Sequence, residues 1–139
     1  MCRFLLFLLV STLFVNGCND GSGIIFEGES SHWTASYVEK IHETGIKSLS
    51  GKFSYSNTVS WNLSLKYKGP NLSNVGPVKY SYNTEHGGGE GETSLDRNGY
   101  LNITGRISGE DAAMTSCIDT IAVILEWHGM SEPLELTAR

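Results

Sequence analysis

An acidic, glycine-rich stretch at residues 85–92 is the first place in the sequence where side chains could do chemistry. It contains three carboxylates and one imidazole: Glu85, His86, Glu90 and Glu92. Such groups could bind a metal ion, but their spacing differs from that of an EF-hand loop, and no Gly-Lys-Ser/Thr follows that would bind phosphate. We therefore expect a mobile, solvent-exposed hairpin tip, with metal binding as the alternative.

Nucleophilic or zinc chemistry would need paired histidines or a reactive cysteine. None of the four histidines (His32, His42, His86 and His128) lies two or four residues from another, so none forms a local chelate. Cys117 has no basic residue near it in the sequence that would activate its thiol, and we expect it to be inert. Ser30 lacks the glycine that a nucleophile elbow places two residues after its serine. We predict no catalytic residue, no metal and no cofactor.

Aromatic side chains are the remaining candidates for binding. Trp61 and Trp127 lie in apolar stripes and are expected in the core. Trp33 and the Tyr80/Tyr82 pair would form a recognition patch if their strands present them to solvent. The candidate binding surface therefore consists of Trp33, Tyr80, Tyr82, Glu85, Glu90 and Glu92.

The elements that must position these residues are predicted to be β-strands. Apolar and polar side chains alternate over residues 33–37, 59–67 and 78–82. Residues 121–127 are apolar on both faces, which predicts a central strand that is covered on both sides. Turns are expected at 43–45, at 96–99 between strands 92–95 and 100–107, and at 128–129. At most a helical turn lies near 110–115.

Eight or nine short strands with turn signals between them predict an all-β protein. The favoured fold is an antiparallel β-sandwich, immunoglobulin-like or jelly-roll-like, and a small β-barrel is the alternative. We expect residues 24–139 to form this single domain.

The N-terminus predicts export. Arg3 is followed by an apolar run at residues 4–15, which is too short to span a bilayer but matches a secretory signal. Val15-Asn16-Gly17-Cys18 resembles the lipobox of bacterial lipoproteins. We expect residues 1–17 to be a signal peptide, Cys18 to carry a lipid, and residues 18–23 to be a flexible tether. A secreted protein with a Cys18–Cys117 disulfide bond is the alternative.

The charge of the chain excludes some partners. Its 139 residues include 10 basic and 15 acidic side chains, for a net charge of −5. Nucleic acid is excluded because its phosphates require a basic surface. The same balance argues against electrostatic adhesion to anionic lipid, so any membrane attachment is expected to be covalent.

Two long segments carry a family resemblance. Phe26-Glu27-Gly28-Glu29-Ser30-Ser31-His32-Trp33 and Ile121-Ala122-Val123-Ile124-Leu125-Glu126-Trp127-His128-Gly129-Met130-Ser131-Glu132 resemble small uncharacterised lipoproteins of Bacillus-like Gram-positive bacteria. Asn98-Gly99 and the glycine-rich stretch extend the resemblance over nearly the whole mature chain. The resemblance implies a membrane-anchored protein of the Gram-positive cell surface and brings no activity with it.

These observations lead to one expected function and two alternatives. We expect a non-enzymatic, lipid-anchored module at the cell membrane, facing outside, that binds a ligand or an envelope or extracellular protein partner. A metal-dependent or thiol enzyme would use the 85–92 stretch, the histidines or Cys117. An immunity or inhibitor protein is the third possibility.

Overall fold

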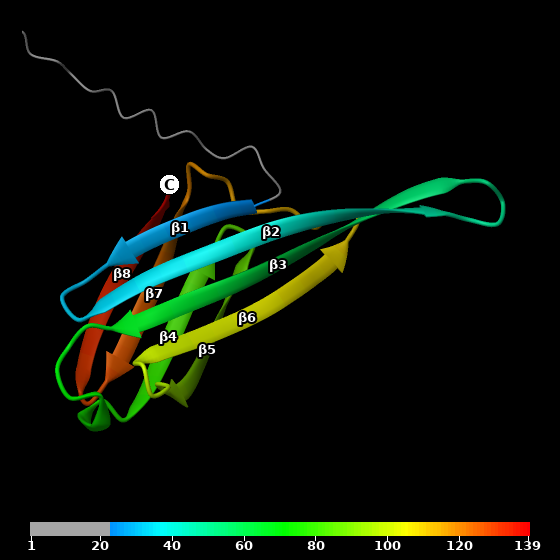
Figure 1. Ribbon diagram of the computed structural model, residues 1–139. Helices are drawn as coiled ribbons and strands as arrows, with labels where there is room; N and C mark the ends of the chain where they lie inside the picture. Colours follow the sequence, from blue (N-terminus) through cyan, green and yellow to red (C-terminus); the bar gives the residue numbers. More distant parts are fainter. Residues whose placement is uncertain (1–22) are drawn as a thin grey trace, which may run out of the picture.

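The computed structural model of the protein describes residues 23–139, which form eight β-strands and one short 3-10 helix (Figure 1). The elements are β1 (Gly23–Glu29), β2 (Trp33–Lys47), β3 (Phe53–Tyr67), η1 (Leu72–Asn74), β4 (Pro77–Thr84), β5 (Gly87–Ser94), β6 (Tyr100–Gly109), β7 (Thr120–Trp127) and β8 (Met130–Ala138). The predicted signal peptide, Cys18 and nearly all of the predicted tether lie outside the described residues. No helix within 23–139 is long and apolar enough to cross a membrane.

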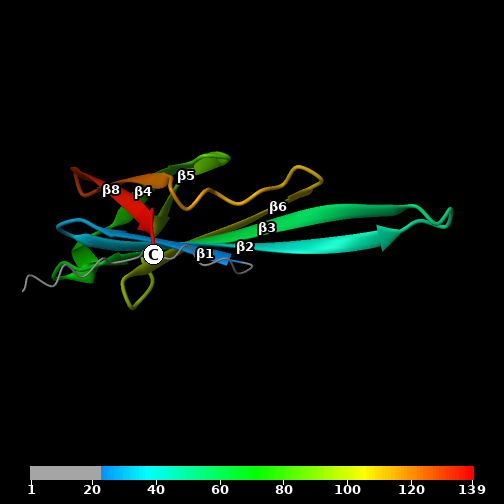
Figure 2. The same cartoon turned by 90° about the horizontal axis from the view of Figure 1, so that it is seen from above.

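The strands form one antiparallel sheet in the order β5-β4-β7-β8-β1-β2-β3-β6. The sheet folds over so that β1, β2, β3 and β6 form one layer and β8, β7, β4 and β5 form the other (Figures 1 and 2). The layers are joined where β1 pairs with β8 through Phe26–Ala138 and Glu27–Thr137. The predicted all-β fold is confirmed: the sheet is nearly barrel-shaped and is consistent with a sandwich or a small barrel.

The core lies between the two layers because each strand directs alternate side chains inward. β7 shows this most clearly, with four inward residues buried and four outward residues exposed. Phe26, Trp33, Leu63, Leu125 and Leu136 are fully buried. The expectation that β7 is covered on both faces was wrong, because Ile124 on its outer face is 47% exposed.

The predicted turn at residues 43–45 was also wrong. β2 continues through Gly45, which is paired with Tyr55, and reverses only after Lys47. The turn is closed by a bond from the Ser48 N–H to the Lys52 carbonyl, with Gly51 at φ 81°. β2 and β3 therefore form a ribbon that projects well beyond the rest of the molecule (Figure 1).

The chain between residues 85 and 99 also differs from the prediction. Residues 87–94, expected to lie largely in a mobile tip, form strand β5, so the β4–β5 turn is confined to Glu85 and His86. Asn98-Gly99 does form a turn, with Gly99 at φ 81°. That turn joins the two layers instead of closing a hairpin, because β5 pairs with β4 and β6 pairs with β3.

The turn at His128-Gly129 is confirmed. His128 has φ 46° and Gly129 has φ 74°, and the flanking Trp127 and Met130 are paired. At most a helical turn was expected near residues 110–115, and residues 110–119 contain no helix, which agrees with this limit. They form an extended crossing from β6 to β7, which we call the strap.

Candidate functional site

The candidate site is a cleft of about 320 Å³ between the two layers, under the strap. Its walls include Tyr37 and Glu39 of β2, Val59 and Trp61 of β3, Tyr82 of β4 and Ile107 of β6. Across the cleft, the Trp61 Nε1–H donates a hydrogen bond of 3.1 Å to the Tyr82 hydroxyl. A volume at the lower end of the range for ligand pockets suits a small molecule.

Glycines make room for the aromatic rings. Gly105 is paired with Trp61, and a Cβ at Gly105 would overlap the indole ring. On the other layer Gly89 is paired with Tyr82, and a Cβ there would lie 2.9 Å from the phenol ring. The glycines of β5 therefore let tyrosine rings lie over the strand, which accounts for much of the glycine-rich stretch without a metal.

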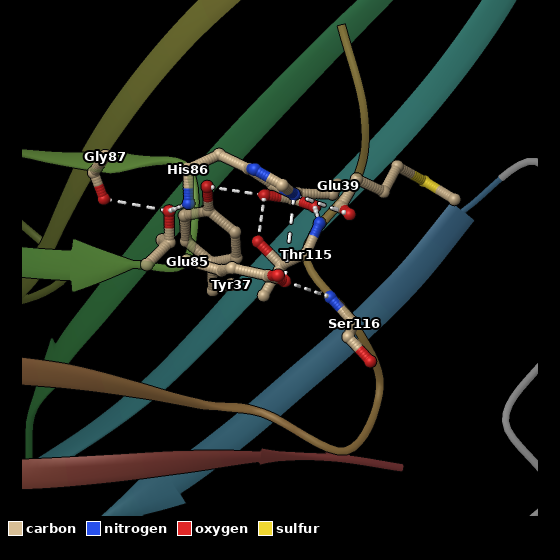
Figure 3. A network of polar contacts seen from close by, with 9 residues as sticks. Tyr37, Glu39, Glu85, His86, Gly87, Thr115 and Ser116 are labelled. Carbon is tan, nitrogen blue, oxygen red and sulfur yellow. Dashed lines mark hydrogen bonds and ion pairs between the residues drawn. The ribbon is translucent and has the colours of Figure 1, made fainter. Parts of the chain in front are cut away.

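Glu39 is the buried charged residue of the cleft, with 4% of its surface exposed. Its carboxylate accepts hydrogen bonds from the Tyr37 hydroxyl (3.0 Å), the Thr115 N–H (2.6 Å) and the Thr115 hydroxyl (2.8 Å; Figure 3). Burial and the adjacent Glu39 raise the pKa of Tyr37, so the phenol stays a donor. In the described part of the chain, no lysine, arginine or histidine forms an ion pair with Glu39.

The strap is tied to both layers. Besides Glu39, the Asn57 side chain of β3 donates to the Ala112 carbonyl at 3.3 Å. On the other side, His86 Nε2 donates to the Met114 carbonyl at 3.0 Å, and Glu85 accepts from the Ser116 N–H at 3.3 Å (Figure 3). The strap therefore covers the cleft and is held there by contacts to β2, β3 and the β4–β5 turn.

Two carboxyl groups interact at the end of the strap. The Ser116 N–H and a hydrogen bond with Asp119 lower the pKa of Glu85. The same hydrogen bond, together with desolvation, raises the pKa of Asp119.

The charge lining the cleft is negative. Glu39 and Asp111 contribute carboxylates, and neither lysine nor arginine is among its described lining residues. A larger hollow of about 580 Å³ lies over the outer faces of β1 and β2. Among its charged residues, Arg139 pairs with Glu27 at 2.6 Å. The cleft is the better candidate because, among residues 23–139, its buried carboxylate forms no ion pair with a lysine, arginine or histidine.

The predicted binding surface is not one surface in the structure. Trp33 is fully buried and packs edge-on against Trp127, with ring centroids 5.3 Å apart, so it belongs to the core. Tyr82 lines the cleft, and Glu85 holds the strap above it. Glu90 and Glu92 lie on the outer face of β5 with Lys79, and Tyr80 packs inward against the core.

Sequence reasoning missed Glu39, Tyr37 and Thr115 and placed Trp61 in the core. Trp127 is buried as expected, whereas Trp61 is only partly buried. A signal for Glu39 was present: it occupies the inward position that follows Trp33, Ala35 and Tyr37 on β2. A charged residue at such a position indicates a specific polar site. Thr115 gave no local signal, because the strap brings it to Glu39 from 76 residues away.

A second polar cluster contains a serine, a histidine and a glutamate. Glu132 accepts hydrogen bonds from the Ser30 hydroxyl, the His32 N–H and the His32 Nδ1. The serine therefore bonds to the glutamate, whereas a nucleophile would have to bond to the histidine. This cluster ties the β1–β2 turn to the β7–β8 hairpin.

Cys117 is disulfide-bonded, which corrects the expectation of an inert free thiol. The other cysteines of the sequence, Cys2 and Cys18, lie outside the described residues. Across residues 23–139, no three His, Cys, Asp or Glu side chains are grouped so as to hold a metal ion.

Comparisons with known proteins add no name to this site. No protein-family model, no curated protein and no solved structure matches the chain.

Proposed function

We propose that the protein is a non-enzymatic extracytoplasmic module that binds a small organic cation in the cleft. One observation carries the proposal: the buried carboxylate of Glu39 faces a cleft whose described lining residues include no lysine or arginine. Three hydrogen-bond donors satisfy this carboxylate, but they bring no positive charge to it. A cationic ligand would supply that charge.

The aromatic walls support the same class of ligand. Tyr37, Trp61 and Tyr82 line the cleft, and aromatic rings attract ammonium groups through their π-systems. Val59 and Ile107 add apolar surface that would contact the rest of the ligand. An anion would meet the carboxylates of Glu39 and Asp111 and is disfavoured.

A pair of probes of similar shape and opposite charge tests this proposal. We expect benzyltrimethylammonium to raise the Tm of the protein in a concentration-dependent manner, because it binds the folded state alone. We expect benzoate, an aromatic anion, to leave the Tm unchanged. Equal shifts with both probes, or none with either, would contradict the proposed ligand class.

Two variants locate the bound probe. Trp61→Leu keeps an apolar wall but removes the ring, and it should weaken binding of benzyltrimethylammonium by about tenfold. Tyr55→Leu removes an aromatic ring that is 60% exposed outside the cleft and should not change binding. Equal affinities of the two variants would place the probe elsewhere.

Two features support export to the outside of the cell. The apolar run at residues 4–15 is typical of a secretory signal, and disulfide bonds such as that of Cys117 are typical of oxidising compartments. From the lipobox-like Val15–Cys18, the proposal includes a lipid on Cys18 that holds the module at the membrane.

The disulfide bond of Cys117 favours a second candidate, a secreted protein without a lipid. Cleavage after residue 17 would remove Cys2, so that Cys18 would be the only other cysteine left in the chain. One sulfur atom cannot carry both a thioether to lipid and a disulfide bond. Mass spectrometry of the mature protein separates the two: a lipid mass on Cys18 supports the anchor, and a peptide containing Cys18 linked to Cys117 refutes it.

A further inference from the structure

The ribbon formed by β2 and β3 leaves the body of the protein without support from any other strand. Pairing of β1 with β2 ends at Lys40, and pairing of β6 with β3 ends at Asn57. Residues 44–56, which we call the arm, pair within the described structure only with each other (Figure 2). At about 3.3 Å per residue, the four residues from Thr44 to Lys47 carry the tip roughly 13 Å outward.

The tip of the arm is apolar and exposed. Leu49 is completely exposed, and Ile46, Phe53 and Tyr55 are 55%, 59% and 60% exposed. A two-stranded ribbon by itself is marginally stable in water, and its two free edges and apolar tip favour contact with another surface. The charged and apolar residues of the arm indicate what kind of surface it contacts.

The arm is basic although the chain as a whole is acidic. No aspartate or glutamate occurs between Glu43 and Glu85, whereas Lys47 and Lys52 flank the turn at the tip. Lys47 Nζ lies 5.4 Å from the centre of the Phe53 ring. Aliphatic and aromatic side chains flanked by lysines match the boundary of an anionic bilayer, where rings and alkyl groups enter the lipid and ammonium groups meet headgroups.

We propose that the tip of the arm docks on an anionic phospholipid membrane, with Leu49 and Phe53 entering it and with Lys47 and Lys52 on its headgroups. Charge complementarity favours lipid over a second copy of the chain, because edge-to-edge pairing of two tips would bring their lysines together. The net charge of −5 belongs to the whole chain, whereas the tip of the arm carries the positive charges of Lys47 and Lys52. This docking requires neither a lipid on Cys18 nor a ligand in the cleft.

Vesicle co-sedimentation tests the docking. The full chain is produced without a lipid and mixed with phosphatidylcholine vesicles that contain or lack phosphatidylglycerol. We expect binding to the anionic vesicles that weakens as salt is added. We expect Leu49→Ser/Phe53→Ser to weaken this binding at least tenfold, and Lys47→Gln/Lys52→Gln to abolish the preference for phosphatidylglycerol.

Ile124→Ser is the matched control, since it removes an isoleucine that is 47% exposed on the body and should leave binding unchanged. Tryptophan fluorescence checks that each variant is folded. The proposal would be overturned if the wild type bound vesicles equally well with and without phosphatidylglycerol. It would also be overturned if the arm variants bound as tightly as the wild type. A concentration-dependent dimer in sedimentation velocity that the arm variants lose would also overturn it, in favour of a second copy.

Discussion

Glu39 occupies an inward-facing position of β2, where the alternation of the strand predicts an apolar side chain. At the scale of single residues, its burial is tolerated because Tyr37 and Thr115 donate three hydrogen bonds to its carboxylate. Those bonds also fix the strap, so the carboxylate links the stability of the fold to the shape of the cleft. Removing it should therefore affect both.

We predict that Glu39→Ala lowers the free energy of unfolding by roughly 2–3 kcal/mol, because it leaves the buried Thr115 N–H without an acceptor. Urea unfolding measures this change. Glu43→Ala is the control, since Glu43 follows on the same face of β2 but is exposed, and it should change stability by less than about 0.5 kcal/mol. Equal losses in the two variants would show that the strap is held by its other contacts.

The Glu132 cluster predicts a loss of stability in acid. Burial raises the pKa of Glu132, but the hydrogen bonds from Ser30 and His32 outweigh it and lower the pKa below the ordinary value of 4.5. A carboxyl whose folded-state pKa is depressed stabilises the fold above its unfolded pKa. Its contribution should be complete above about pH 4.5 and should be lost as the pH falls through the lower, folded-state value.

Urea unfolding as a function of pH checks this prediction. Glu132→Gln should flatten the acid limb of the stability profile, because the amide cannot be protonated in this range. Glu135→Gln, which changes an exposed carboxyl on the same strand, should leave the limb in place. A Glu132→Gln profile that still falls as steeply as the wild type would assign the acid sensitivity to other groups.

At the scale of elements, glycines opposite aromatic residues shape the cleft. Trp61 of β3 lies over Gly105 of β6, and Tyr82 of β4 lies over Gly89 of β5. Each ring covers a position that has no side chain, so the walls of the cleft depend on pairs of strands.

We predict that Gly105→Ala destabilises the protein by about 1–3 kcal/mol, since the added methyl group overlaps the Trp61 ring. It should also shift the tryptophan emission and weaken binding of benzyltrimethylammonium. Gly109→Ala on the same strand is the control, because a Cβ there meets no atom within 4 Å. If both variants behave alike, the cost arises from the strand backbone instead of the ring.

The sequence predicted the strands better than their ends. Alternation at residues 33–37 and 59–67 located β2 and β3, because one face of each is buried along these segments. It could not show that Gly45 continues β2, since glycine is also common in turns, and Tyr55 opposite it became visible only in the pairing. The same ambiguity concealed β5, whose glycines resemble a loop until the tyrosines of β4 lie over them.

At the scale of the whole molecule, the body and the arm are two parts with little in common. Glu43 is paired with Asn57, so a two-residue Asn-Gly turn could join these positions directly. We predict that replacing residues 44–56 in this way changes the unfolding free energy by less than about 1 kcal/mol, because the arm's apolar side chains are already exposed. It should abolish binding to anionic vesicles and preserve probe binding in the cleft. Collapse of the body in urea unfolding would show instead that the arm supports the fold.

The candidate site could be predicted only in fragments, because it exists at the level of the whole molecule. The binding surface proposed from sequence contained Tyr82 and Glu85, which do lie in or above the cleft. Nothing in the local sequence of Thr115 connects it with Glu39, and nothing in that of Trp61 connects it with Tyr82. Those pairs form when the two layers close on each other.

The pairing of β1 with β8 affects when the sheet can close during synthesis of the chain. Phe26 pairs with Ala138, so this edge of the two layers cannot close until both segments have been synthesised. Contacts between residues so far apart in sequence close large loops and form late in folding. A nascent chain of this protein therefore stays open along this edge until residues 137 and 138 have been synthesised.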